Sequence, residues 1–265
     1  MEQPNSIEAH NLTVSYQRKP VLWNIDFVLP KGKIIGILGP NGSGKTTLLK
    51  SMLGLLPLDS GYVRFFDQPL AKSRNRVAYV PQRETVDWDF PTNVLEVVKM
   101  GRIPNKGLFT KISNNDPVVN QAIEAVGLKD FKDRQISQLS GGQQQRVFIA
   151  RSLAQEADLY ILDEPFTGVD MASEKAIMDL LQAMREEGKT IVVVHHDLPT
   201  AKKVFDWAIL LNTRMVAAGP INEVLTADNI ESAYGGKLDG LSQVGDALKA
   251  AQFPVREKNK EDRDV

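Results

Sequence analysis

Hydrophobic and polar positions alternate in two stretches near the N-terminus. Apolar side chains occupy every second position over residues 12–16 and again over residues 25–29, and the run from Gln17 to Pro20 between them is typical of a turn. A period of two places successive side chains on opposite faces of a strand, so that one face is buried and the other meets solvent. The pattern predicts a pair of half-buried antiparallel strands.

Short apolar runs without alternation follow at residues 34–38, 159–162 and 191–194. Runs of this kind are typical of strands that are covered on both faces, as in a mostly parallel sheet. Helical patterns lie between them. The order therefore predicts an α/β fold with a mostly parallel sheet and an N-terminal antiparallel β subdomain.

The chain changes character over about residues 84–157, where helical patterns dominate. The clearest helical patterns extend from Val94 to Met100, from Val118 to Val126 and from Gln143 to Gln155. The polar stretch from Asn105 to Asp116 separates the first two. We interpret this region as a helical subdomain inserted into the α/β core.

The C-terminal part predicts a closing hairpin and then a helix. Apolar residues over 207–211 and 215–219 flank two turn-forming residues, and residues 222–234 have a helical pattern. The run 256–265 is almost wholly charged or polar, which is typical of a solvated, disordered tail.

Composition bounds the class of protein. The 265 residues suffice for one large domain, which we expect over residues 1–240 with the helical subdomain at 84–157, followed by a C-terminal extension over 241–265.

A formal net charge of −1 gives no overall electrostatic reason to bind nucleic acid. The chain has no cysteine, which excludes disulfides and thiolate metal sites. No apolar stretch reaches the roughly 18 residues that a membrane helix needs, so we expect any membrane role to depend on a partner.

A glycine-rich run, Gly39 to Thr46, follows the first continuous apolar run and precedes a helical pattern. Its glycines let backbone N–H groups turn toward phosphate oxygens, and the positive end of the following helix adds to them. Lys45 supplies a cation and Thr46 a hydroxyl ligand for Mg²⁺. A strand-to-helix turn without a ligand has no need of this pair, so we predict a phosphate-binding loop.

Chemically active residues follow each of the other predicted core strands. In an open parallel sheet, ligands bind beyond the carboxyl ends of the strands, so these residues are expected to share one site. They are Gln82 after Val77 to Val80, Asp163 and Glu164 after residues 159–162, and His195 and His196 after residues 191–194.

The carboxylates Asp163 and Glu164 are adjacent, and on an extended chain adjacent side chains point in different directions. Asp163 would hold the Mg²⁺ shell through a water, and Glu164 would orient and deprotonate the attacking water. The alternative is a carboxylate pair that only caps a helix ahead of Pro165.

His196 is placed to donate toward a γ-phosphate and to hold the water in line, although a lone histidine at a strand end is often only structural. We expect its neighbour His195 to point the other way and to be structural. Gln82 suits contact with Mg²⁺ and water because its amide both donates and accepts, and a plain surface glutamine is the alternative.

A second glycine-rich segment, Leu139 to Gln143, opens a long helical run. It places the Ser140 hydroxyl, the small residues Gly141 and Gly142 and unpaired N–H groups at a helix N-terminus, where anions bind. The segment predicts a second phosphate site rather than a helix cap without a ligand.

Over nearly the whole chain, these segments resemble the ATP-binding subunits of ABC transporters. Gly39 to Thr46 matches their Walker A loop, and Leu139 to Gln143 matches their signature motif. The resemblance implies the ABC ATPase fold, with a P-loop NTPase core, and ATP and Mg²⁺ as cofactors. The nucleotide-binding residues that it implies are Tyr16, Gly39, Pro40, Asn41, Gly42, Ser43, Gly44, Lys45, Thr46 and Thr47.

The resemblance also assigns roles outside the phosphate loop. Tyr16 falls at the adenine-stacking position, although a tyrosine at a strand end is more often part of a core or a rim. The catalytic residues are Glu164, His196 and Gln82, the Mg²⁺ ligands are Thr46, Gln82 and Asp163, the last through water, and Asp170 lies in the D-loop.

In this family two copies pair head to tail, and each ATP lies between the phosphate loop of one copy and the signature motif of the other. The resemblance therefore implies that Ser140, Gly141, Gly142 and Gln143 act in trans and that hydrolysis requires a dimer. Nucleotide binding would favour the closed dimer by differential affinity.

Two local features resemble the narrower group that imports metal ions such as manganese, zinc or iron. They are the run Val86 to Pro91 and the doubled His195 and His196. In the family this lobe receives a coupling helix of the membrane subunit, for which exposed Trp88 and Phe90 would be anchors. The alternative is that both aromatic side chains pack in the core of the lobe.

The resemblance implies further partners and a location. The partners are an integral-membrane permease and, indirectly, an external solute-binding protein, which would carry the metal selectivity. The subunit would lie at the cytoplasmic face of the cell membrane, peripheral through the permease. The sequence leaves open the ion, the permease, the direction of transport and the role of the C-terminal tail.

Two alternatives stay open at this point. An exporter, or an importer of iron complexes or another solute, shares all the nucleotide motifs. A soluble ABC-type scaffold ATPase, as in iron-sulfur cluster assembly, is an alternative of a different class. The long coiled-coil insertions of the DNA-repair members and the second cassette of the translation members are both missing from the sequence.

Overall fold

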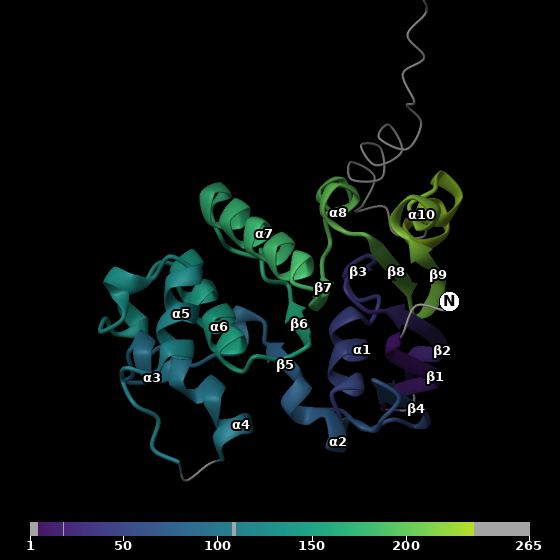
Figure 1. The fold of residues 1–265 in the computed structure, drawn as a ribbon. Coiled ribbons are helices and arrows are strands. Elements are labelled where there is room, and N and C mark those ends of the chain that lie inside the picture. The colour runs from purple at the N-terminus through teal and green to yellow at the C-terminus, as the bar shows by residue number, and fades with distance from the viewer. Residues whose placement is uncertain (1–4, 18, 108–109, 236–265) are drawn as a thin grey trace, which may run out of the picture.

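Two sheets form the framework of the protein, which the computed structural model describes over residues 5–17, 19–107 and 110–235 (Figure 1). The strands are β1 (Asn5–Tyr16), β2 (Lys19–Pro30), β3 (Ile34–Leu38), β4 (Ser60–Phe65), β5 (Val77–Val80), β6 (Leu159–Asp163), β7 (Thr190–Val194), β8 (Trp207–Asn212) and β9 (Arg214–Pro220). The α-helices are α1 (Lys45–Met52), α2 (Leu70–Ser73), α3 (Val94–Lys99), α4 (Ile103–Lys106), α5 (Pro117–Ala125), α6 (Gly141–Ala154), α7 (Met171–Glu186), α8 (Leu198–Val204), α9 (Ile221–Val224) and α10 (Ala227–Tyr234). Short 3-10 helices cover Arg74–Arg76, Arg83–Thr85, Met100–Arg102, Lys129–Phe131 and Ile136–Gln138.

The larger sheet is mostly parallel, as predicted. It has six strands in the order β5-β6-β7-β3-β8-β9, of which only β9 runs antiparallel to its neighbour. The smaller sheet has the order β2-β1-β4 and is antiparallel. The predicted alternating strands pair in it, with Ala9 opposite Phe27 and Leu12 opposite Ile25. The predicted α/β class is therefore confirmed.

The strands of the parallel sheet are buried on both faces, which explains their continuous apolar runs. In β3, Ile35 and Ile37 belong to a core shared with α1 and the antiparallel sheet. Ile34 and Leu38 belong to a second core on the opposite face, shared with α7, α8 and the helical region. Helix α1 thus lies between the two sheets, and Figure 1 shows it in the centre of the molecule.

Helices α3, α5 and α6 pack against one another in a lobe, drawn at the left of Figure 1. Val98, Ile123 and Val147 are buried in it. The three helices predicted between residues 94 and 155 are all present, with ends that differ by a few residues.

The C-terminal elements follow the prediction with one difference. Strands β8 and β9 form the expected hairpin. The helical pattern over 222–234 is divided between α9 and α10, because the Thr226 side chain accepts a hydrogen bond from the Asn229 N–H and so caps a new helix. The predicted tail at 256–265 and the extension at 241–265 lie outside the described residues.

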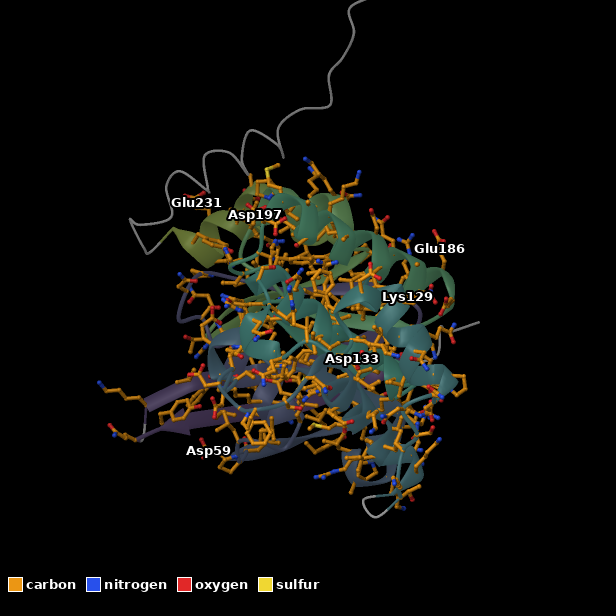
Figure 2. All side chains as sticks on the ribbon, turned by 90° about the vertical axis from the view of Figure 1, so that its left-hand side faces the viewer. Asp59, Lys129, Asp133, Glu186, Asp197 and Glu231 are labelled. Carbon is orange, nitrogen blue, oxygen red and sulfur yellow. The ribbon has the colours of Figure 1, made fainter. Side chains whose placement is uncertain are left out.

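No helix within the described ranges is both long and apolar enough to span a membrane. Figure 2 views the molecule from the side of the helical lobe. Asp197, which caps α8, and Glu231 of α10 lie at one end, and Asp59, next to the antiparallel sheet, lies at the other.

Candidate functional site

The order of the parallel strands brings the predicted site residues to one edge. Strands β5, β6, β7 and β3 are consecutive neighbours and run in the same direction. Gln82, the pair Asp163 and Glu164, the histidine pair and the phosphate loop therefore lie along the same carboxyl edge of the sheet. This arrangement agrees with the predicted convergence of strand ends.

The phosphate loop joins β3 to α1, and its backbone requires glycine at two places. Gly39 has a φ of +149°, and a Cβ there would lie 2.1 Å from the Leu211 carbonyl oxygen. Gly44 has a φ of +100°, and a Cβ there would lie 2.7 Å from Cδ2 of Leu22 in β2. A side chain at either position would displace the loop from the elements that support it.

Lys45 is buried at the start of α1, and its ammonium bends back over the loop. The Nζ atom donates to the carbonyl oxygens of Gly39 at 2.9 Å and of Pro40 at 3.0 Å. Asn41 and Gly42 are exposed beside it at the tip of the loop. The loop therefore holds a cation in place before any anion arrives.

Thr46 of α1 contacts Asp163 at the end of β6, although β7 lies between β6 and the strand β3 that leads into α1. Thr46 Oγ1 donates to Asp163 Oδ1 at 3.2 Å, and Asp163 is fully buried. Its other oxygen, Oδ2, has no hydrogen-bond partner among the described residues. Burial and, to a lesser degree, the charge of Glu164 raise the Asp163 pKa to about 6, against the lowering effect of the Thr46 hydrogen bond.

This pair fits a divalent cation. A buried carboxylate with an unpartnered oxygen is costly, and a bound cation would lower that cost. Hydroxyl and carboxylate oxygens are ligands that suit Mg²⁺. Thr46 and Asp163 could therefore hold the ion, and the further ligand Gln82 stays a prediction.

Glu164 is held by two donors on one oxygen. Gln82 Nε2 and Thr167 Oγ1 each donate to Glu164 Oε2 at 3.2 Å. The expectation of extended backbone at Glu164 is wrong, because β6 ends at Asp163 and Glu164 has a φ of +50°. This left-handed conformation, uncommon for a residue other than glycine, gives the two carboxylates their different surroundings.

The two histidines differ in burial. His195 is buried between the rings of Phe166 and Phe205, at centroid distances of 5.3 and 5.8 Å. Burial, followed by the charge of His196, lowers the His195 pKa to about 4, so the ring is neutral near pH 7. This agrees with the structural role expected for His195. His196 is half-buried at the end of β7, and its contact with a γ-phosphate stays a prediction.

The second glycine-rich segment begins α6 with a capping box. Ser140 Oγ accepts from the Gln143 N–H at 3.3 Å, and the Ser140 N–H donates to Gln143 Oε1 at 2.9 Å. A Cβ at Gly142 would lie 2.4 Å from Ser173 Oγ, and Ser173 in turn donates to Asp170 at the start of α7. The segment thus lies against Asp170 of the same chain, while Ser140 itself is exposed.

Residues 22–167 match the ABC transporter family, a segment that covers more than half of the chain. The chain belongs to this family. Its members bind ATP, which agrees with the phosphate loop described above.

Curated ABC relatives resemble the chain over most of its length. The manganese transport system ATP-binding protein MntB of Bacillus subtilis is 52% identical, over 88% of this chain and 93% of the relative. The zinc transport system ATP-binding protein TroB of Treponema pallidum is also 52% identical, over 88% of each.

Among solved structures, a metal-chelate type ABC transporter in an inward-facing conformation matches with a TM-score of 0.78. It is 29% identical, over 88% of this chain and 90% of that chain. The fold assignment to the ABC ATPases is thereby confirmed.

Tyr16, expected at the adenine position of an ABC protein, is the last residue of β1 and is 47% exposed. The antiparallel sheet that carries it reaches the phosphate loop through Leu22. The ring is therefore accessible to a planar base, and the stacking itself stays a prediction.

Three residues that hold the site were not predicted from the sequence. Thr167 donates to Glu164. Arg83, the residue after Gln82, donates to Gln144 of α6. The Thr213 N–H donates to the Ser43 carbonyl oxygen at 3.0 Å. Thr167 stands three positions after Glu164, a spacing that would allow a side-chain contact across a turn. Arg83 and Thr213 carry no comparable signal, because their partners are distant in the sequence.

The two aromatic residues of the run from Val86 to Pro91 differ from each other. Trp88 is not exposed as expected, because its ring packs against Phe148 with an edge contact at 5.2 Å and its Nε1 donates to the Arg83 carbonyl at 2.9 Å. Phe90 is 56% exposed. Trp88 is thus half-buried against the core of the lobe, and Phe90 is the more exposed of the two.

Proposed function

We propose that this protein is the ATP-hydrolysing subunit of a membrane ABC transporter that energises the import of a metal ion such as manganese or zinc. The position of Glu164 carries the hydrolytic part of the proposal, because Gln82 and Thr167 orient its carboxylate beside the Thr46 and Asp163 pair. The manganese and zinc systems to which the 52% identical relatives belong support the metal part.

The phosphate loop would bind the nucleotide. Its N–H groups and the start of α1 face the phosphates, and Lys45 moves its ammonium from the loop carbonyls onto phosphate oxygens. Mg²⁺ held by Thr46, Asp163 and Gln82 would neutralise charge on those oxygens. Tyr16 would stack on the adenine.

Glu164 would act on the attacking water. With Oε2 already bound by two donors, the second oxygen is left to accept a proton from the water as it attacks the γ-phosphorus. His196 donates to the γ-phosphate and keeps the water in line. Positioned proton transfer of this kind contributes roughly 10² to 10⁴ in rate.

The complete site would need a second copy of the chain. Ser140 to Gln143 of the partner would close over the γ-phosphate in a head-to-tail dimer, with Asp170 at the seam. The exposure of Ser140 at the start of α6 supports this arrangement. Residues 1–240 would form the ABC ATPase domain with the inserted helical subdomain at about 84–157.

An integral-membrane permease would bind this dimer at the cytoplasmic face of the membrane. An external solute-binding protein would deliver the ion to the permease. The ion selectivity then belongs to those partners, since the residues described above contact only the nucleotide and its Mg²⁺.

The test is metal uptake by cells that carry Glu164→Gln in place of the natural chain. We expect ATP to stay bound, ATP hydrolysis to fall by roughly 10³, and accumulation of one metal to fail, because Gln cannot take the proton from water. Glu186→Gln, an exposed change at the end of α7 that Figure 2 places at the molecular edge, is the matched control. Normal uptake of manganese, zinc and iron in Glu164→Gln cells contradicts the metal part.

A second candidate is an importer of metal chelates. The solved metal-chelate type transporter, with a TM-score of 0.78, favours it. Uptake assays with the free ion and with the chelated ion separate the two, since only the proposed ion importer supports uptake of the free ion.

A further inference from the structure

The end of β8 and the turn that follows it support the phosphate loop at two points. The Leu211 carbonyl oxygen occupies the space where a Gly39 Cβ would lie, at 2.1 Å. Two residues later, the Thr213 N–H donates to the Ser43 carbonyl oxygen at 3.0 Å. This segment therefore contacts both the beginning and the middle of the loop.

Thr213 is constrained on both sides. Its φ of +60° is left-handed, which is costly for a β-branched residue and persists only where the surroundings impose it. Its carbonyl oxygen accepts from the Trp23 N–H of β2 at 2.9 Å, while its own N–H is bound to Ser43. The conformation of the turn and that of the loop are thus coupled.

Helix α10 holds the turn from the other side. Asn212 is half-buried, and its Nδ2 donates to the Ala233 carbonyl oxygen at 3.0 Å. The last carbonyl groups of a helix have no partner within it, so Asn212 satisfies one of them. This side chain is therefore a direct link between α10 and the turn that supports the loop.

The last residue of α10 also lies close to the loop. Tyr234 is buried, and burial raises the pKa of its hydroxyl, while the Gly39 backbone N–H acts in the opposite direction. Asp197 is near enough to raise this pKa as well. Figure 2 shows Asp197 at the same end of the molecule as Glu231 of α10.

We propose that α10 is a positioning element for the phosphate loop. The hydrogen bond from Asn212 to the Ala233 carbonyl couples α10 to the loop through residues Leu211 to Thr213. The inference rests on the proposed nucleotide site. Loop N–H groups bind phosphate well only when they are already oriented, and the apparent affinity falls with the fraction of molecules in the competent state. Release of Asn212 from α10 lowers that fraction.

The test compares two half-buried asparagines with the same chemistry. Asn229 Nδ2 also donates to a backbone carbonyl, that of Val224 at 3.0 Å, but it does not contact the turn. Calorimetric titration with ADP and Mg²⁺ gives the Kd, and thermal unfolding gives the stability. We expect Asn212→Ala to raise the Kd about fivefold, the equivalent of one hydrogen bond, and Asn229→Ala to lower the Tm without changing the Kd.

The change Asn212→Leu removes the donor with little change in shape and adds no charge, and it serves as the second variant if Asn212→Ala does not fold. A Kd for either Asn212 variant within about twofold of the natural value overturns the proposal. Asn229 joins α10 to the end of α9, so an equal rise in Asn229→Ala overturns the specific role of Asn212 as the link. Lys45→Ala is measured beside them. If Lys45→Ala binds ADP normally, the nucleotide site itself is wrong, which is a failure of the proposed function and not of the role of α10.

Discussion

Arg83 Nε donates to Gln144 Oε1 at 3.0 Å and so joins the residue after Gln82 to the helix that Ser140 begins. The Cζ atom of the same guanidinium lies 3.3 Å from the position that a Cβ atom would occupy if residue 141 were not glycine. Gln82 in turn donates to Glu164, so a short chain of contacts runs from the Glu164 carboxylate to the start of α6. Arg83 is thus placed to keep the start of α6 in a fixed relation to Gln82 and Glu164.

We expect Arg83→Ala to lower kcat for ATP hydrolysis roughly tenfold and to leave the Kd for ADP unchanged. The reason is that Arg83 orients Gln82 and α6 without contacting the phosphate loop, and small misplacements of reacting groups are costly in rate. Steady-state kinetics and ADP titration measure the two quantities. Arg64→Ala, an exposed arginine of β4, is the control. A large change in ADP affinity with an unchanged kcat contradicts this role.

Thr167→Val should lower kcat several-fold, because Glu164 Oε2 loses one of its two donors and the carboxylate is less well fixed. Thr167→Ser keeps the hydroxyl and should retain most of the activity. ATP turnover at saturating Mg²⁺ measures both. Equal activity of the Val and Ser variants would show that the hydroxyl does not orient Glu164.

Asp163→Asn should act in opposite directions on stability and on Mg²⁺ binding. Burial raises the Asp163 pKa to about 6, so the charged form is disfavoured in the fold, and removal of the charge should stabilise the metal-free protein by about 3 kcal/mol at pH 7. The Mg²⁺ concentration for half-maximal nucleotide binding should rise at least about tenfold. Denaturant unfolding and Mg²⁺ titration provide the two readouts.

Asp59→Asn is the control for this prediction, since Asp59 is exposed, lies next to the antiparallel sheet and is at the opposite end of the view from Asp197 (Figure 2). We expect neither quantity to change in it. A metal-free Asp163→Asn protein that is less stable than the natural one would mean that Asp163 has a structural role instead.

His195 makes the stability depend on pH. Its pKa falls from 6.5 to about 4 on burial, so the unfolded chain binds more protons between these values. The contribution of His195 is fully present above about pH 6.5 and is lost as the pH falls toward 4, a change of about 3 kcal/mol.

The measurement is the free energy of unfolding of the natural chain minus that of His195→Leu, from pH 4 to pH 7. The difference is needed because the raised pKa of Asp163 acts with the opposite sign over part of the same range. We expect the natural chain to lose stability relative to the variant as the pH falls. A difference that does not vary with pH would show that His195 titrates normally.

Much of the site was predictable, because its chemistry is encoded in short segments. The phosphate loop, the Asp163 and Glu164 pair and the capping segment at Ser140 each occupy a few consecutive residues next to a recognisable strand or helix. The Trp88 environment was not predictable in the same way, because its partner Phe148 lies on another helix. Nor was the left-handed Glu164, since the pattern of β6 does not reveal where extended backbone ends.

The sequence by itself determined the elements, the α/β class and the residue types at each strand end, because period, capping and glycine placement are local properties of the chain. Only the tertiary structure decided which of these residues meet. Thr46 and Asp163 are 117 positions apart, and their contact depends on β3 and β6 both pairing with β7. The support of the phosphate loop by Thr213, and the hold of α10 on Asn212, likewise arise from packing between distant segments, which no local pattern specifies.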